Sequence, residues 1–372
     1  MLRVDVDLQP VPPPPRKKDY PIGIVGAGFI VNDVQLVAYR KAGYNVRAIA
    51  SAHPEHARHV AARHGIPKVY QSWRELAADP ELEVLDVAVP PGEQPPILLE
   101  LASSARHLKG VLAQKPLALN YAEAARIVDA FQQAGIVLAV NQNMRYDQSV
   151  RACKTLLERG ELGQPVLATI EMRASPHWQP WCAAYGRMTL LIMSIHHLDT
   201  FRYWFGDPES VYVSVREDPR TAERWRHRDG IALYILEYAN GLRAAAWDDV
   251  WAGPWKEGSG ADVYIRWRVE GTEGIARGTI GWPAWPNAEP STIDFTTRAA
   301  NCWFSPRWKE VWFPDAFAAT MGQLFDALAC GTEPAVSGRD NLHTMALVEA
   351  CYKSVEEHRP VRLEEILSGG VA

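Results

Sequence analysis

The stretch YPIGIVGAGFIVND, residues 20–33, decides the fold. Its apolar run Ile22–Val25 predicts a short buried strand, which a glycine turn and then a helix follow. The turn matches G-x-G-x-x-[G/A] except at its last position, Val31. Gly26 permits a tight turn, and Gly28 lets the backbone approach a pyrophosphate, whose charge then meets the N–H groups of the helix. The stretch therefore predicts a dinucleotide site, with Phe29 and Ile30 also at the cofactor.

Composition favours an ordinary soluble protein with two hydrophobic cores. The chain has 372 residues, of which 47% are hydrophobic and 22% charged, and its formal net charge is −5. We therefore expect no nucleic-acid partner, and no apolar run is long enough to suggest a membrane partner. Five scattered cysteines without a C-x-x-C pair fit reduced thiols, so we expect a cytoplasmic protein without a disulfide frame or a zinc site.

The region after the glycine turn alternates helical and strand patterns. A capping box at Asn120 marks one helix start, and apolar runs such as residues 84–89 are typical of buried parallel strands. This alternation predicts a doubly wound parallel sheet over residues 19–143. The expected helices cover residues 33–42, 54–64, 96–107 and 121–134, and the further strands residues 46–50, 84–89, 111–113 and 136–140.

After residue 143 the pattern changes to runs of strands between turn residues. Asp147 is expected to cap a helix that ends near Arg159, and Asn240-Gly241 is a strong hairpin signal. The region predicts an α+β domain with a large, mainly antiparallel, open-faced sheet. Its expected strands cover residues 166–172, 211–215, 232–238, 242–247, 264–269 and 275–280, and its last helices residues 316–329 and 341–357.

Two polar segments follow predicted strands of the first sheet. Ser51 stands where an NAD-binding fold usually has an acidic residue, and His53 follows, so NAD and NADP both remain open. Lys115, in QKPL, comes directly after a buried strand, at the edge where open α/β sheets bind ligands. Its ammonium group is suited to hydrogen-bond a substrate hydroxyl and to move a proton while hydride passes to nicotinamide.

The third polar segment is SIHHLDTFRYWFG, residues 194–206. On a helix, His196 and Asp199 are three residues apart and share a face. Such a pair suits a proton relay, a substrate clamp or a buried capped histidine; without a third ligand at clear spacing we predict no metal. The chain has 14 tryptophans, which serve as core aromatics or as flat platforms for sugar rings.

These motifs together resemble the Gfo/Idh/MocA oxidoreductases, which include glucose–fructose oxidoreductase and inositol dehydrogenase. The resemblance covers residues 19–362 and rests on GAGFI, VPP, QKPLA, NQNMRYD, IHHLDTFRYWFG and GRDNLHTMALVEA in this order. It implies a Rossmann domain at 19–143 and a substrate-binding and oligomerisation domain at 144–372, while the prolines of residues 1–18 predict a stiff extended arm before them. It further implies NAD or NADP as cofactor, a sugar or cyclitol substrate, and a homodimer or homotetramer that assembles through the sheet.

The resemblance also assigns roles to residues. Lys115 and His196 become catalytic, and Pro90, Pro91 and Gln94 fall on a segment beside the nicotinamide. Three departures stand out: Gln114 replaces the glutamate before the lysine, Ile192 replaces an aspartate, and Ser51 replaces the acidic residue of NAD-type members. The remaining candidates are Asn143 and Gln114 at the cofactor, where Lys115 is expected as well, and Asp199, Arg145, Arg173, His177 and Trp178 at the substrate.

Our leading hypothesis is an oxidoreductase that transfers hydride between nicotinamide and a ring hydroxyl of a sugar, glycoside or cyclitol. The alternative is a glycosidase of the same family that keeps its cofactor, oxidises a sugar carbon transiently, eliminates the aglycone and re-reduces the product. A third reading is a ligand sensor on a borrowed Rossmann fold. Net formation of reduced cofactor separates the first two.

Overall fold

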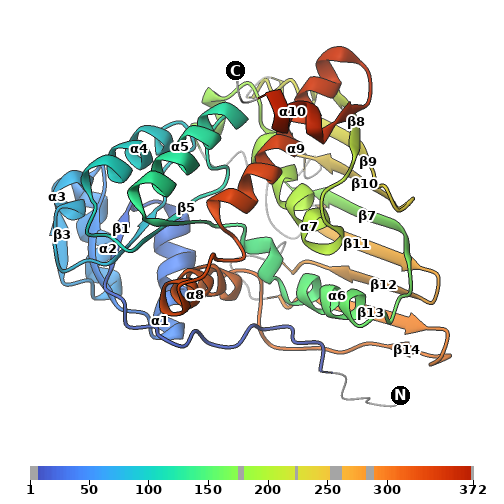
Figure 1. Ribbon diagram of the computed structural model, residues 1–372, viewed down its shortest axis with the longest axis horizontal. Helices are drawn as coiled ribbons and strands as arrows, with labels where there is room; N and C mark the ends of the chain where they lie inside the picture. The colour runs from blue at the N-terminus through green and yellow to red at the C-terminus, as the bar shows by residue number, and fades with distance from the viewer. Residues whose placement is uncertain (1–6, 175–179, 223–224, 252–261, 282–288, 370–372) are drawn as a thin grey trace. The chain divides into compact units, whose positions relative to one another are not determined.

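The computed structural model describes residues 7–174, 180–222, 225–251, 262–281 and 289–369 (Figure 1). The described chain contains one sheet of six strands and one of nine, and it divides into two compact units. The first unit comprises Pro12–Asn143 and Phe313–Met345, and the rest of the described chain forms the second. The expected fold class, a Rossmann-type parallel sheet with an α+β domain, is confirmed.

The sheet of the first unit is parallel throughout, in the order β3-β2-β1-β4-β5-β6. Its central strands are fully buried, as apolar strands with helices on both faces should be. The strand order reverses between β1 and β4, which is the point where open α/β sheets bind ligands. The strands are β1 (Ile22–Val25), β2 (Val46–Ala50), β3 (Lys68–Tyr70), β4 (Val84–Val87), β5 (Gly110–Ala113) and β6 (Val137–Val140).

The helices expected in residues 19–143 are present with corrected boundaries, and α3 is an additional helix that the sequence pattern did not predict. The helix after the glycine turn begins at Ile30, not at Asp33, and opens with a π-helix, η1 (Ile30–Gln35). The helix expected from residue 96 begins at Gln94, because proline is compatible with a first helical turn. The helices are α1 (Leu36–Ala42), α2 (Pro54–His64), α3 (Trp73–Ala77), α4 (Gln94–Ser104), α5 (Tyr121–Ala134) and α8 (Asp315–Cys330).

One helix of this unit comes from the far end of the sequence. Helix α8 contacts α1, β5 and β6, and the Tyr44 hydroxyl donates a 2.9 Å hydrogen bond to the carbonyl of Ala318. Tyr20 and Tyr44 both pack on Phe325, with ring centroids 5.2 and 5.0 Å apart. The core of the dinucleotide-binding unit is therefore completed by a segment that begins 170 residues after Asn143, and no local pattern indicates this.

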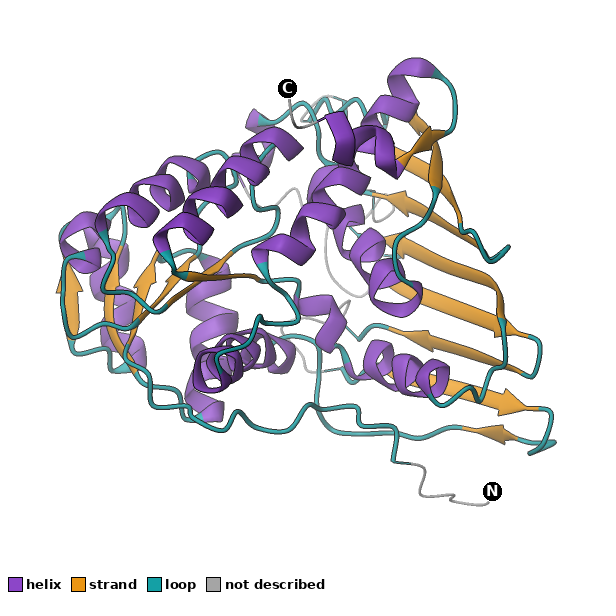
Figure 2. Cartoon of the chain, viewed as in Figure 1, coloured by secondary structure: helices purple, strands orange, loops and turns teal. Residues whose placement is uncertain are grey.

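The second unit is built on the nine-stranded sheet β14-β13-β12-β11-β7-β10-β9-β8-β15 (Figure 2). Its neighbouring strands are antiparallel except β7 and β10, which are parallel. The Asn240-Gly241 hairpin joins β9 to β10, and Gly241 has the left-handed φ of +88° that such a turn requires. The strands are β7 (Pro165–Arg173), β8 (Ser210–Arg216), β9 (Ile231–Glu237), β10 (Arg243–Asp249), β11 (Tyr264–Gly271), β12 (Gly274–Thr279), β13 (Thr292–Thr297), β14 (Trp303–Phe304) and β15 (Val361–Arg362).

Helices cover one face of this sheet and leave the other open. Helix α6 contacts β12 and β13, and α7 packs on α6. Asp147 caps α6 as expected, since its carboxylate accepts the amides of Ser149 and Val150. The remaining elements are α6 (Gln148–Glu158), the π-helix η4 (Thr189–Ser194), α7 (Ile195–Phe205), α9 (Gly338–Glu357), α10 (Leu363–Gly369) and two 3-10 turns, η2 (Asn143–Tyr146) and η3 (Pro180–Ala184).

Candidate active site

The candidate cofactor edge is the carboxyl end of the parallel sheet in the first unit. Parallel strands of one sheet end at one edge, so the segments after β1, β2, β4, β5 and β6 gather there. These segments carry Gly26, Ser51, Pro90, Lys115 and Asn143, respectively. Five separate predictions from the sequence therefore fall on one edge of one sheet.

The glycine turn has the geometry that a dinucleotide requires. Gly26 has φ +116°, and a Cβ there would lie 2.1 Å from the carbonyl oxygen of Ala88, so only glycine fits. Its amide donates a 2.8 Å hydrogen bond to Ala50 on β2. Gly28 is exposed, and a Cβ there would meet nothing within 4 Å. The turn is thus locked on its inner side and open on its outer side, and it fits a pyrophosphate group.

The helix that follows the turn is irregular where the motif departs from its usual form. Val31, in the place of a small residue, is 1% exposed, and η1 runs through it as a π-helix. Short π-helical segments occur frequently at functional sites. Phe29 and Ile30 are half-buried at the start of this helix.

The end of β2 leaves the cofactor preference open. The Ser51 hydroxyl accepts a 3.2 Å hydrogen bond from the amide of His53, at the N-cap position of α2. The His53 side chain is exposed, and its ring lies 5.3 Å from that of His56. Ser51 and the exposed His53 and His56 therefore occupy the place where an NAD-binding fold usually has an acidic residue that binds the ribose.

The segment after β5 is held by one buried amide. Gln94, 0% exposed, donates from Nε2 to the carbonyls of Gln114, Pro116 and Leu117, at 2.9 to 3.1 Å. Its Oε1 accepts the Gln114 amide at 2.8 Å. The side chain that we expected at the cofactor is therefore engaged with the backbone on both sides of Lys115, and it fixes the path of that segment. Lys115 itself is half-buried.

A chain of buried amides extends from this segment toward α8. Asn141 donates from Nδ2 to Oε1 of Gln114 at 3.2 Å and accepts from the hydroxyl of Thr320 at 2.9 Å. Asn143, 2% exposed, donates to the carbonyl of Asn141 at 3.1 Å. Sequence reasoning did not find Asn141 or Thr320, because their partners come from distant parts of the chain.

A carboxylate that we had not predicted to act lies inside the parallel sheet. Asp86 is 0% exposed and accepts hydrogen bonds at Oδ2 from Gln35 Nε2 at 2.8 Å and from the Tyr39 hydroxyl at 2.7 Å. Burial raises the pKa of Asp86 to about 7, against the lowering effect of these donors and of Gln114. A carboxylate in an otherwise apolar central strand is the sequence signal that marks this position.

The second unit carries the candidate catalytic histidine near the start of α7. His196 is 7% exposed, and its ring meets that of Trp312 edge to face, with centroids 5.7 Å apart. The expected helix is confirmed, and it places Asp199 one turn after His196. The replaced aspartate position, Ile192, lies in the π-helix η4 and is 3% exposed.

Two predicted substrate ligands bind each other. Arg145 donates from Nε and Nη2 to the two carboxylate oxygens of Asp199, both at 2.6 Å. Their side chains are 7% and 2% exposed, so this is a buried, bidentate ion pair. Asp199 is therefore an anchor that fixes the plane of the Arg145 guanidinium group.

A further buried pair, not expected from the sequence, adjoins the candidate histidine. His197 Nδ1 lies 2.9 Å from Oδ1 of Asp248 on β10, and both side chains are 0% exposed. The Ser194 hydroxyl donates to the other oxygen of Asp248. These contacts fasten the first turn of α7 to the sheet.

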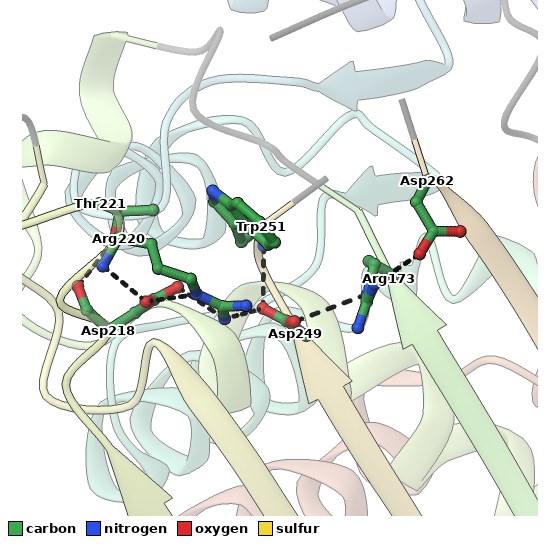
Figure 3. A network of polar contacts seen from close by, with 7 residues as sticks. All are labelled: Arg173, Asp218, Arg220, Thr221, Asp249, Trp251 and Asp262. Atoms are coloured by element: carbon green, nitrogen blue, oxygen red, sulfur yellow. Dashed lines mark hydrogen bonds and ion pairs between the residues drawn. The ribbon is translucent and has the colours of Figure 1, made fainter. Parts of the chain in front are cut away.

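Arg173 belongs to a network of charged groups at the ends of β7 and β10 (Figure 3). It pairs with Asp262 and lies 3.6 Å from Asp249, which in turn accepts from Arg220 at 2.7 Å. Burial raises the pKa of Asp249, and Arg220 opposes that rise. The Arg173 guanidinium thus already faces two carboxylates. The other candidates on this segment, His177 and Trp178, lie outside the described residues.

The described part of the chain shows neither a cluster for a metal ion nor a helix suited to cross a membrane. No group of three or more His, Cys, Asp or Glu side chains in the described ranges is arranged to hold a metal ion. Within the same ranges, no helix has the length and apolar character to cross a membrane.

The fold and the cofactor edge define the class first: a two-unit α/β protein with a dinucleotide-binding sheet. Residues 20–142 match the family model described as "Oxidoreductase family, NAD-binding Rossmann fold", and residues 154–363 match "Oxidoreductase family, C-terminal alpha/beta domain". The chain therefore belongs to the Gfo/Idh/MocA oxidoreductase family, as the resemblance implied, and its nucleotide cofactor is NAD or NADP.

Individual relatives agree with this assignment over nearly the whole chain. D-apiose dehydrogenase of Rhizobium rhizogenes is 28% identical over 351 residues, covering 92% of this chain and 97% of the relative. Myo-inositol 2-dehydrogenase of Thermotoga maritima is 25% identical over 331 residues, covering 86% and 91%. A crystal structure of an oxidoreductase from Agrobacterium radiobacter with NAD+, L-tartaric acid and magnesium superposes with a TM-score of 0.79 at 23% identity, covering 94% and 99%, and supports the fold.

Proposed function

We propose that this oxidoreductase transfers hydride between NAD or NADP and a ring hydroxyl of a sugar, glycoside or cyclitol. The observation that carries the proposal is the shared edge of the parallel sheet. There an open glycine turn follows β1, and Lys115 follows β5 in a segment whose backbone Gln94 holds on both sides of the lysine. The named relatives act on a sugar and on a cyclitol, which supports this substrate class.

In this proposal Lys115 and His196 assist the movement of the hydroxyl proton. The Lys115 ammonium donates a hydrogen bond to the substrate oxygen and stabilises the negative charge that develops on it while its proton and the hydride leave. A buried imidazole beside an aromatic ring is suited to accept the same proton. Arg145, oriented by Asp199, is proposed to hold a substrate hydroxyl, and Arg173, His177 and Trp178 stay candidates for the outer part of the substrate.

Pro90, Pro91, Gln114 and Asn143 remain proposed cofactor neighbours, together with the glycine turn. Ser51 and His53 are proposed to face the adenosine ribose. Without an acidic residue at position 51, nothing there repels a 2′-phosphate. Titration of the protein with NAD+ and NADP+ by tryptophan fluorescence measures the preference, and Ser51→Asp should shift it toward NAD+.

The test of the function is the stoichiometry of reduced cofactor. The protein is incubated with NAD+ or NADP+ and, separately, with free sugars, cyclitols and aryl glycosides. One reduced cofactor per oxidised sugar is the expected result. Release of the aglycone without accumulation of reduced cofactor would instead show redox-assisted glycoside cleavage. Neither reaction with any member of the panel would reject the proposal.

We also propose that the chain self-associates through the open face of the nine-stranded sheet. Large apolar side chains on that face are exposed at neighbouring strands, including Tyr212 at 43%, Leu233 at 50% and Ile235 at 47%. Contiguous apolar surface of this kind marks an interface. A dimer or tetramer in light scattering that Leu233→Lys and Ile235→Lys together dissociate is the expected outcome; a monomeric wild type would reject it.

A further inference from the structure

The most unusual group in the dinucleotide-binding unit is the carboxyl of Asp86. It lies in the central strand β4, in register with Ile24 on β1 and Leu112 on β5, so it sits inside the sheet at the strand-order reversal. Its donors, Gln35 and Tyr39, come from the two helical segments that follow the glycine turn. Among the described residues, no lysine or arginine forms an ion pair with it.

Asp86 also reaches the segment that carries Lys115. Val87 is in register with Ala113, so Gln114 is the next residue after the paired end of β5. The Gln114 side chain lies close enough to Asp86 to affect its ionisation. Oδ1 of Asp86 and Nε2 of Gln114 are both buried without a hydrogen-bond partner. An acceptor and a donor of neighbouring side chains are thus both unsatisfied, which is costly unless a small shift joins them.

We propose that Asp86 is a positioning residue that acts through Gln114 on Lys115 and couples the glycine-turn helix to the lysine-bearing segment. The inference rests on the proposed role of Lys115. On one side the carboxyl holds Gln35 and Tyr39, and on the other it orients the Gln114 amide, whose Oε1 is held by Asn141. The Asp86 carboxyl also lies on the strand next to this segment, since Asp86 is in register with Leu112, three residues before Lys115.

The arrangement predicts that the carboxylate can be exchanged between positions 86 and 114. Gln114→Glu alone gives two carboxyl groups in one buried cluster, and Asp86→Asn alone gives none. The double variant Asp86→Asn with Gln114→Glu restores one. We expect each single change to lower kcat/KM about tenfold, and the double variant to return to within about threefold of wild type rather than to the product of the two losses.

The control is Asp79→Asn in the loop before β4. Asp79 is also nearly buried and also accepts a tyrosine hydroxyl at 2.7 Å, from Tyr70, but it is paired with Lys68. Asp79→Asn should lower the unfolding temperature and leave kcat/KM unchanged, and its combination with Gln114→Glu should be additive.

The pH profile of kcat/KM gives a readout that a purely structural role would not change. The groups that face the Asp86 carboxyl are Gln35, Gln114 and the phenol of Tyr39, whose own pKa is raised far above its usual value by burial. The wild type should therefore show an ionisation near neutral pH that is absent from Asp86→Asn. Identical profiles, or additive losses in the exchange experiment, would overturn the proposal while the wild type stays active. A wild type inactive on every sugar would instead reject the function of Lys115 itself.

Discussion

Asp86 and Asp79 show how two carboxylates of one unit can differ in charge. Each accepts a tyrosine hydroxyl at 2.7 Å, from Tyr39 and Tyr70, respectively. Burial inside the sheet raises the pKa of Asp86 to about 7. The hydrogen bond from Tyr70, together with the Glu81 amide and Lys68, lowers the pKa of Asp79. The same tyrosine contact therefore accompanies opposite shifts, and the surroundings decide which group is ionised.

The comparison indicates different roles for the two carboxylates: Asp79 stabilises the fold, whereas Asp86 belongs to the candidate site. Asp79 stabilises its loop through a charge that its partners satisfy. Asp86 lies at the cofactor edge with neutral partners, in a place where a protein gains nothing in stability from an ionised group. Strongly perturbed carboxyls concentrate at functional sites, which is why we assign Asp86 to the site and Asp79 to the fold.

The largest effect on stability is expected for a third carboxylate, Asp199, which is buried and bound by an arginine through both of its oxygens. Arg145→Met removes the bidentate partner of buried Asp199, which keeps Arg202 Nη1 at 3.9 Å, and the free energy of unfolding should fall by about 3 kcal/mol. Urea denaturation measures the loss. The matched control, Arg74→Met, breaks a bidentate pair with Glu100 that is exposed, and it should change stability far less. Equal losses would show that burial does not govern these pairs.

The next effect is the pH dependence that Asp86 imposes on stability. Because its pKa is higher in the folded state than the usual value near 4, the folded state binds more protons between about pH 4 and pH 7. Stability should therefore fall as pH rises through that window, by up to about 3 kcal/mol between pH 5 and pH 8. Urea denaturation at several pH values measures this slope in wild type and in Asp86→Asn. The slope should be present in the wild type and absent from the variant.

Asp79 should behave in the opposite way. Its pKa is lowered in the folded state, so its contribution is complete above its unfolded pKa and is lost only as pH falls below it. Asp79→Asn should consequently leave the slope between pH 5 and pH 8 unchanged. The assignment would be wrong if the dependence of stability on pH between pH 5 and pH 8 were lost in Asp79→Asn or kept in Asp86→Asn.

The smallest effect tests the two tyrosines directly. Tyr39→Phe and Tyr70→Phe each remove one hydrogen bond to a carboxylate and should each cost about 1 kcal/mol. The pKa of Asp86 should rise further in the first variant, and that of Asp79 should rise toward its usual value in the second. Carbon-detected NMR titration of the carboxyl groups follows both; a fall in either pKa would contradict the geometry.

The parts of the molecule that follow from the sequence are those with local signals. The glycine turn, the Asp147 cap and the Asn240-Gly241 hairpin each depend on a few neighbouring residues, and the structure confirms them. The strands that sequence reasoning missed are short or follow no clear pattern. They are β3, β13, β14 and β15.

The buried contacts of the site could not be predicted because they join distant segments. Asp86 accepts hydrogen bonds from Gln35 and Tyr39, which lie 51 and 47 residues before it in the sequence. The Arg145–Asp199 pair spans 54 residues, so each residue alone suggested a substrate ligand although they bind each other. Residue types at the cofactor edge are readable from the sequence, whereas their partners depend on the finished fold.

The most direct test of the central claim is the rate of hydride transfer in Lys115→Met at saturating cofactor and sugar. Lys109→Met is its control, because Lys109 precedes the other end of β5 and is paired with Glu83 at the surface. We predict that Lys115→Met, saturated with NAD(P)+, forms reduced cofactor at least about 100-fold more slowly, while Lys109→Met keeps the wild-type rate. Hydride transfer at the wild-type rate in Lys115→Met would contradict the account.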